Sequence, residues 1–312
     1  MKKIILLVVG LLLCSLPGFA SGVFSPDTTC LFAVKDSSSL YLDFYAPTGD
    51  RFLDGKEKPA VIFVFGGGFM EGSRNKDSYL PWFQRLTEEG YPVFSIDYRL
   101  GMKGVKAKGL KFVKAMDYAI RIAVEDLFSA TSFIVENASL FDVDPANLVV
   151  SGSSAGAITS MQAEYEICND TPIASILPPG FNYAGVMSFA GAILSFKGKL
   201  KYSHEPCPQL LLHGTADKVV AYKQIKVFRI GFFGSSKIVE RLRKFGFVYN
   251  ILRYAGHGHD IASHLFATLP DQLRFLETNV VLGVPRIVDS TIDDPQVPLL
   301  TGGHSNLKDL YD

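Results

Sequence analysis

Short apolar runs alternate with longer amphipathic stretches along most of the chain, and this alternation constrains the fold more than any other feature. The runs at 60–65, 91–97 and 147–150 are almost continuously apolar, which is typical of strands buried on both faces of a sheet. The pattern predicts a mostly parallel sheet of about eight strands, with helices covering both faces. We expect strands at 40–45, 60–65, 91–97, 147–150, 183–189, 209–212 and 247–254, and helices at 110–136, 157–167, 236–245 and 260–280.

The length and composition favour one domain. The chain has 312 residues, of which 48% are hydrophobic, and this is enough for a single large core. We predict a folded domain over residues 21–282 and a surface tail over 283–312, where the periodicity fades. Lys plus Arg and Asp plus Glu both total 31, so the overall charge does not indicate a nucleic-acid-binding protein.

The first residues have the pattern of an export signal. Lys2 and Lys3 precede an apolar run that ends at Leu16, and small residues follow. We predict a signal peptide over residues 1–20, cut after Ala20, and a secreted or periplasmic protein. Cys14 fits a lipoprotein signal poorly because three leucines precede it. The apolar run is too short for a stable membrane span, and no later segment has the length of one.

Three cysteines remain after the signal, at positions 30, 168 and 207. Export permits one disulfide, for which we suggest Cys168 and Cys207. The cysteine spacing contains no CxxC pair, so a cysteine-rich metal site is not expected.

A cluster of small residues, Gly152-Ser-Ser-Ala-Gly156, directly follows the predicted strand at 147–150. It fits the pattern G-x-S-x-G, in which a serine occupies a sharp strand-to-helix corner and its neighbours must be small. An ordinary turn is the alternative for the pentapeptide alone. Its position between a buried strand and a helix favours Ser154 as a nucleophile.

Three glycines, at positions 66 to 68, follow the strand at 60–65. Glycines expose backbone amides and let a substrate approach closely. We expect the amides of Gly67 and Gly68, together with that of Ala155, to form an oxyanion hole. A flexible loop is the alternative for the glycines taken alone.

A serine nucleophile needs a base and a carboxylate that orients the base. His257 and His259 lie just after the last predicted strand, and Asp217 follows the strand at 209–212. The chain order serine, aspartate, histidine is the order of hydrolases built on this kind of sheet. His213 is expected to be a structural residue, and Asp217 taken alone could be a turn or capping residue.

With these motifs, the sequence resembles the α/β-hydrolase superfamily, and more narrowly its esterase/lipase branch of carboxylesterases and hormone-sensitive-lipase-like proteins. The resemblance extends over roughly residues 38–281, with a DYRL stretch at 97–100 and an Asp-Pro pair at 144–145. It implies a catalytic triad of Ser154, Asp217 and His259. The family motif G-x-G-H favours His259 over the rival His257. Phe65 stands where the family usually has histidine, so the packing of the oxyanion loop must differ.

The resulting hypothesis is an exported serine hydrolase that cleaves carboxylic esters through an acyl-enzyme. The substrate would be a small-molecule or glycan-linked ester, and the chemistry needs no metal or organic cofactor. A peptidase or amidase of the same fold and a catalytically silent binding protein are the alternatives. The aromatic segment at 222–234 could wall the substrate pocket through Phe228, Phe232 and Phe233, or could simply pack in the core.

Overall fold

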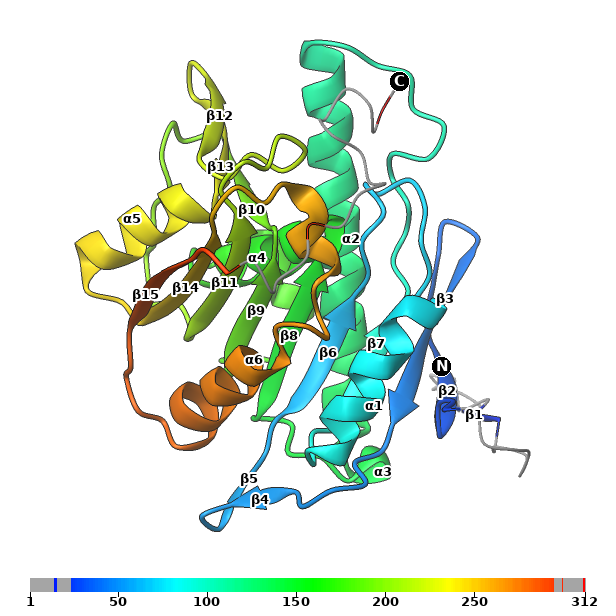
Figure 1. Ribbon diagram of the computed structural model, residues 1–312. Helices are drawn as coiled ribbons and strands as arrows, with labels where there is room; N and C mark the ends of the chain where they lie inside the picture. The colour runs from blue at the N-terminus through cyan, green and yellow to red at the C-terminus, as the bar shows by residue number, and fades with distance from the viewer. Residues whose placement is uncertain (1–13, 16–23, 295–298, 300–310, 312) are drawn as a thin grey trace, which may run out of the picture.

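A large sheet forms the centre of the molecule (Figure 1). The computed structural model describes residues 14–15, 24–294, 299 and 311. Within these residues the sheet has ten strands, in the order β1-β2-β3-β7-β6-β8-β9-β11-β14-β15. Their bounds are β1 Cys14–Ser15, β2 Thr28–Lys35, β3 Ser38–Tyr45, β7 Val93–Ile96, β6 Ala60–Val64, β8 Leu148–Ser153, β9 Gly185–Phe189, β11 Gln209–Gly214, β14 Tyr249–Tyr254 and β15 Val288–Ile292.

The seven strands β7, β6, β8, β9, β11, β14 and β15 pair in parallel with one another. The strands β1, β2 and β3 form an antiparallel edge, and β3 joins β7 in an antiparallel pair. The prediction of a mostly parallel sheet of the α/β-hydrolase type is therefore confirmed. Because parallel strands share one direction, the loops that follow β6, β8, β11 and β14 all leave the same edge of the sheet.

Three strands at the edges of the sheet, β1, β2 and β15, lie outside the strands expected from the sequence. Residues Val288–Ile292 form β15, parallel to β14, although they belong to the segment predicted to be a surface tail. This strand is mostly polar and partly exposed, so it has no apolar run that would identify it. At the other edge, Cys14–Ser15 pair with β2. The rest of the predicted signal peptide lies outside the described residues.

Helices cover both faces of the sheet. Helices α1 (Leu80–Glu88) and α6 (Leu269–Phe275) lie on one face, and α2 (Leu110–Glu136) and α4 (Ala155–Ile167) lie on the other (Figure 1). The indole Nε1 of Trp82 in α1 donates a hydrogen bond to Gln272 Oε1 in α6 at 2.8 Å. Helix α2 packs on α4, so the two layers enclose the strands.

The predicted helix over 260–280 is wrong in its first half. Residues His259–Ser263 form a 3₁₀ turn, α6 begins only at Leu269, and Leu276–Val281 continue it as a π-helical turn. Pro270 lies in the first turn of α6, where its missing N–H is no loss, whereas it would break the middle of a longer helix.

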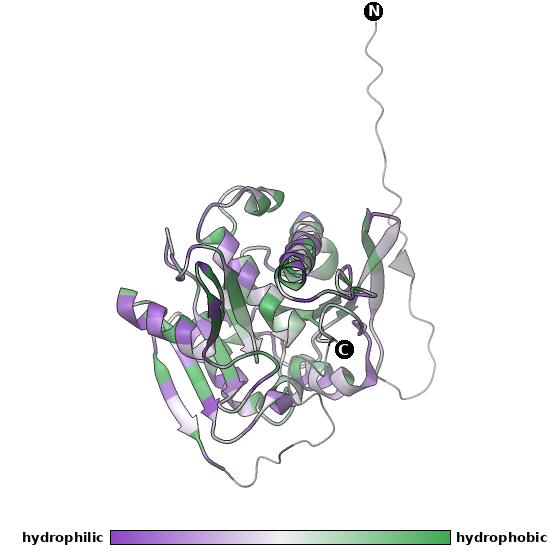
Figure 2. Ribbon diagram, turned by 90° about the horizontal axis from the view of Figure 1, so that it is seen from above, coloured by the Kyte–Doolittle hydropathy of each residue, from purple (hydrophilic) through white to green (hydrophobic). Residues whose placement is uncertain are grey.

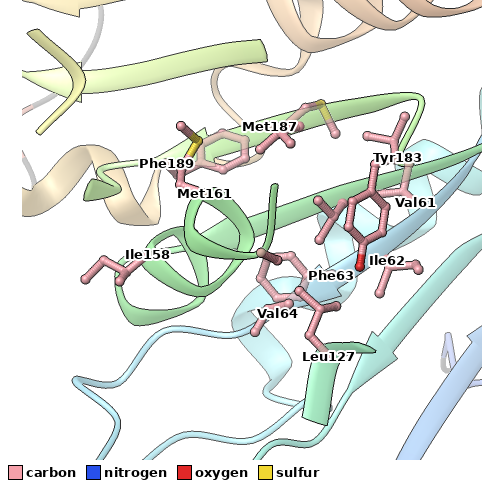
Figure 3. Close-up of a cluster of buried hydrophobic side chains, with 14 of the residues drawn as sticks. Val61, Ile62, Phe63, Val64, Leu127, Ile158, Met161, Tyr183, Met187 and Phe189 are labelled. Atoms are coloured by element: carbon pink, nitrogen blue, oxygen red, sulfur yellow. The ribbon is translucent and has the colours of Figure 1, made fainter. Parts of the chain in front are cut away.

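The central strands are buried on both sides. All five residues of β6 are buried. Figure 3 shows Val64 near side chains from α2 and α4, such as Leu127 and Ile158, whereas the ring of Phe63 packs against Trp82 and Phe83 of α1 on the opposite face. This double burial explains why β6 is continuously apolar in sequence. It also fixes the position at which the glycine loop after β6 leaves the edge of the sheet.

A buried carboxyl lies beside two cysteines that were predicted to form a disulfide. That pairing is wrong, because Cys168 and Cys207 are both free thiols in the structure. Instead, Glu164 Oε1 accepts hydrogen bonds from Cys168 Sγ at 3.3 Å and from the Cys207 amide at 2.8 Å. Burial raises the pKa of Glu164, although these donors oppose the shift. Burial likewise raises the pKa of both thiols.

We predict that Glu164→Gln removes part of the pH dependence of stability. Because the pKa of Glu164 is higher in the folded state than its unfolded value of about 4.3, folding retains a proton. The carboxyl therefore lowers the free energy of unfolding as pH rises from about 4 through its folded pKa. Urea unfolding across this range should show a gain in stability of Glu164→Gln over wild type that grows with pH.

The half-buried Glu166, two residues further along α4, provides a matched control as Glu166→Gln. A Glu164→Gln variant whose stability follows the wild-type pH profile without divergence would contradict this account of the buried carboxyl.

Candidate active site

Ser154 sits on a strained corner between β8 and α4. Its φ of 51° is in the left-handed region, which is unfavourable for a residue with a side chain. The glycines around it are required by close backbone packing. A Cβ on Gly152 would lie 2.3 Å from the carbonyl carbon of Gly156, and one on Gly156 would lie 1.9 Å from the oxygen of Val64. The corner is thus held by contacts that only glycine allows.

The structure brings together the three predicted residues Ser154, His259 and Asp217. Ser154 Oγ lies 2.7 Å from His259 Nε2, and His259 Nδ1 lies 2.8 Å from Asp217 Oδ2. Both distances are within hydrogen-bond reach. With Nδ1 donating to the carboxylate, Nε2 is free to accept the serine proton. Such an arrangement could supply a nucleophile, a base and a residue that orients the base.

Asp217 is held as a carboxylate by several donors. Its Oδ1 accepts hydrogen bonds from the amides of Val219 at 2.8 Å and Val220 at 3.0 Å. Burial alone would raise the pKa of Asp217, but hydrogen bonds from His213 and His259 outweigh burial and hold it well below its usual range. The residue is therefore ionised at neutral pH.

His213 has a closer relation to the site than the sequence indicated. Its Nε2 lies 3.0 Å from the carbonyl oxygen of Val220 and 3.2 Å from Asp217 Oδ2. Since a carbonyl can only accept, Nε2 must carry the proton and can donate to the carboxylate as well. His213 was correctly expected to be structural. Its position four residues before Asp217 was the available signal for this contact.

His257, the rival candidate for the base, points into a different network. Its Nδ1 lies 2.7 Å from Asp260 Oδ2, and His264 Nε2 lies 3.3 Å from the same oxygen. Among the described residues, these three form the one group whose side chains could together hold a metal ion. Their mutual hydrogen bonds already account for the potential ligand atoms, so the arrangement fits a buried polar network that supports the loop of His259.

The glycine loop after β6 approaches the serine corner closely. A Cβ on Gly66 would lie 2.9 Å from the oxygen of Ser153 and 3.3 Å from the Cβ of Ser154. In the part of the chain that the structure describes, the amides of Gly67, Gly68 and Ala155 have no hydrogen-bond partner. Gly68 and Ala155 line the cavity that contains Ser154, whereas Gly67 does not.

Phe65 replaces the usual histidine of this loop with aromatic packing. The ring is buried and stacks on Tyr98, with ring centroids 4.4 Å apart. The hydroxyl of Tyr98 donates a hydrogen bond to the carbonyl of Phe65 at 3.0 Å. The expected apolar substitute for the histidine is therefore present, and Tyr98 supplies a hydrogen bond to the loop as well.

An apolar cavity of about 600 Å³ opens over Ser154. None of its described lining residues is charged. The two alternatives for the aromatic segment each hold for part of it, since Phe228 and Phe232 line the cavity whereas Phe233 is buried in the core. Tyr311 closes another side, where its hydroxyl donates to the carbonyl of Gly68 at 2.9 Å. The complete described lining is Gly68, Phe69, Gly109, Leu110, Phe112, Val113, Met116, Ser154, Ala155, Ile158, Leu194, Val219, Val220, Ile225, Val227, Phe228, Ile230, Phe232 and Tyr311.

Comparison with known proteins finds relatives over part of the chain. The family model BD-FAE matches residues 42–171. Gut esterase 1 of Caenorhabditis briggsae is 33% identical over 107 residues, which cover 34% of this chain and 18% of the relative. Human bile salt-activated lipase is 28% identical over a match that covers 41% of this chain and 17% of the lipase. Mouse neuroligin-2 is 30% identical over a match that covers 39% of this chain and 16% of the neuroligin. The chain thus spans less than a fifth of the length of these relatives.

Solved structures agree with the fold over most of the chain. A propionate-bound esterase from Thermogutta terrifontis, Est2, superposes with a TM-score of 0.57 at 20% identity. The superposition covers 81% of this chain and 94% of the esterase, so the similarity extends well beyond the segment that the family model matches. The superposition shows the fold of the chain, and the family model and the sequence relatives support a similarity to the esterase/lipase branch of the α/β-hydrolase superfamily.

Proposed function

We propose that this protein is an exported serine hydrolase that cleaves carboxylic esters. The observation that carries the proposal is the hydrogen-bonded series Ser154, His259 and Asp217 at the edge of an apolar cavity. The serine is part of the cavity lining, so an ester bound there would meet its hydroxyl. The similarity to an esterase and a lipase supports the same reaction class.

In the proposed reaction, His259 Nε2 takes the proton of Ser154 as Oγ attacks the ester carbonyl carbon. Asp217 keeps Nδ1 protonated and stabilises the imidazolium that forms. His259 then returns the proton to the leaving alcohol, which leaves an acyl group on Ser154. Water, activated by His259, releases the acid and restores the serine.

Backbone amides would stabilise the negative charge on the carbonyl oxygen. The amides of Gly68 and Ala155 are assigned to this role because both residues line the cavity with Ser154 and both amides lack partners among the described residues. The amide of Gly67 also lacks such a partner and belongs to the same loop, although Gly67 does not line the cavity. Ala155 begins α4, so the positive end of the helix dipole adds to its effect. Each such donor contributes about 3 kcal/mol to the transition state in related chemistry.

The composition of the cavity favours an ester with an apolar acyl group over a peptide. A peptide substrate brings amide groups that need hydrogen-bond partners, and burying an unpaired amide costs about 1–3 kcal/mol. The lining is nearly all aliphatic and aromatic, so it offers few such partners. An acyl chain needs none.

Export is proposed from the N-terminal pattern of two lysines, an apolar run and small residues. That pattern supports a secreted or periplasmic location. Among the described residues, no helix combines the length and apolarity needed to cross a bilayer.

We predict that Ser154→Ala lowers the hydrolysis of short p-nitrophenyl esters by about four orders of magnitude or more, since no nucleophile remains. The measurement is the initial rate of nitrophenol release by purified protein. Ser160→Ala is the matched control, because that serine is also buried in α4 but bonds only to the Gly156 carbonyl. Equal rates for Ser154→Ala and wild type would leave a silent binding protein as the better reading.

The two histidines of the last loop should respond very differently to substitution. We predict that His259→Ala loses kcat by about the same factor as Ser154→Ala, because the base is removed. In contrast, His257→Ala should keep most of kcat, because His257 bonds to Asp260 and not to Ser154. A greater loss in His257→Ala than in His259→Ala would reverse the assignment of the base.

The apolar cavity predicts a preference for longer acyl chains. Each CH₂ group that becomes buried contributes about 0.8 kcal/mol, which is about fourfold in kcat/KM. We therefore expect kcat/KM to rise from acetate to hexanoate p-nitrophenyl esters, and a chain ending in a carboxylate to be rejected. Ile158→Trp, which would fill the cavity beside Ser154, should shift the preference back towards acetate. A flat profile in wild type would contradict this use of the cavity.

A further inference from the structure

The mouth of the cavity carries exposed apolar side chains. Leu110, Ile225, Val227 and Phe228 are 70%, 47%, 58% and 93% exposed, and all four line the cavity. The last three belong to a hairpin of β12 (Gln224–Val227) and β13 (Ile230–Gly234), which rises beside the start of α2 in Figure 1. Figure 2 views this end of the molecule from above. Exposed apolar residues gathered at one opening indicate an interaction surface.

Phe228 lies at the tip of this hairpin in a backbone conformation that is unfavourable for a large side chain. Its φ is 53°, in a region where turns favour glycine or asparagine and a bulky aromatic residue is unfavourable. The ring packs against little, since it is almost fully exposed. An aromatic residue at this position is therefore not explained by the turn or by the core.

Basic residues are frequent in the two chain segments that supply most of the lining of this opening. The segment 100–116 contains five lysines and no acidic residue, and the segment 218–234 contains three lysines, one arginine and no acidic residue. All nine side chains are exposed, and within the described residues none of them forms an ion pair. This segregation is notable because the whole chain has equal numbers of basic and acidic residues. The nine are Lys103, Lys106, Lys108, Lys111, Lys114, Lys218, Lys223, Lys226 and Arg229.

We propose that the cavity mouth binds the surface of an anionic lipid assembly, from which the enzyme draws its ester substrate. Apolar side chains would enter the interface between headgroups and acyl chains, while lysine and arginine side chains would contact lipid phosphates. The cavity opens at the same surface, so an acyl chain could pass from the lipid to Ser154 without crossing water.

Two other occupants fit the observations less well. A second copy of the chain would bring nine basic residues against nine others, which repel each other. A soluble polyanion would satisfy the lysines but would leave Val227 and Phe228 in water. A lipid surface matches both the charge and the apolar residues.

The inference deepens the proposed function, and binding to lipid can be tested apart from catalysis. The experiment uses Ser154→Ala as the parent protein, so the result does not depend on hydrolysis. Sedimentation with vesicles of phosphatidylcholine alone is compared with sedimentation with a roughly equal mixture of phosphatidylcholine and phosphatidylglycerol, at low and high salt. We expect binding to the mixed vesicles to be at least about tenfold tighter, and to weaken with salt.

Three variants are then made in the Ser154→Ala background, one with a single further substitution and two with a pair of substitutions. Phe228→Ser alone should weaken binding to the mixed vesicles by about tenfold, because apolar contact is lost. Lys226→Glu with Arg229→Glu should weaken it by more than about tenfold, since each basic residue near an anionic surface contributes about fivefold. Phe52→Ser with Lys56→Glu is the matched control, because these exposed residues lie in the β4–β5 hairpin (Phe52–Leu53 and Lys56–Glu57) at the opposite end of the molecule (Figure 1).

The control pair should leave vesicle binding unchanged. Three results would overturn the proposal: no binding to the mixed vesicles, equal weakening by the control pair, or loss through charge reversal with no effect of Phe228→Ser. The last result would indicate a soluble polyanion as the ligand. Circular dichroism of each variant, matched to the parent, ensures that a loss reflects the surface and not the fold.

Discussion

The geometry of the candidate site depends first on the backbone packing around Ser154. Gly152 and Gly156 have no room for a side chain, because Val64 and the start of α4 occupy that space. This packing forces the serine into a left-handed conformation at the edge of the sheet. The parallel sheet then delivers Asp217 and His259 to the same edge, since both follow neighbouring strands. The reactive arrangement is thus a product of strand direction and of missing side chains.

The polar groups of the site are fixed before any substrate binds. Asp217 is buried, and both of its carboxylate oxygens have hydrogen-bond partners. One oxygen accepts from two backbone amides, and the other lies near the imidazoles of His213 and His259. A carboxylate held in this way cannot rotate away from His259 without losing buried hydrogen bonds, which would cost about 1–3 kcal/mol. The cavity side is different, because its walls are apolar and include an exposed hairpin and Tyr311. The site therefore combines polar groups that are held rigidly by hydrogen bonds with apolar cavity walls that can adapt to a ligand.

The sequence predicted the parts of the molecule that depend on local pattern. Strand β6 and helix α2 are evident because their apolar periodicity reflects burial, and Ser154, Asp217 and His259 were found because each follows a buried strand. Strand β15 was missed, since an edge strand can be polar. The free state of Cys168 and Cys207 and the contact of His213 with Asp217 were missed as well, because they depend on how distant segments pack. The segment at 222–234 was recognised as aromatic, but only the structure separates Phe228 at the mouth of the cavity from Phe233 in the core.

In the proposed mechanism, Ser154 becomes covalently acylated during turnover. The most direct measurement is rapid acid quenching of the protein with a p-nitrophenyl ester, followed by intact mass and peptide mass spectrometry. We expect a transient mass increase equal to one acyl group, located on the peptide that contains Ser154 and lost when excess substrate is removed. Hydrolysis that proceeds with no acyl adduct, or with an adduct on another residue, would contradict it.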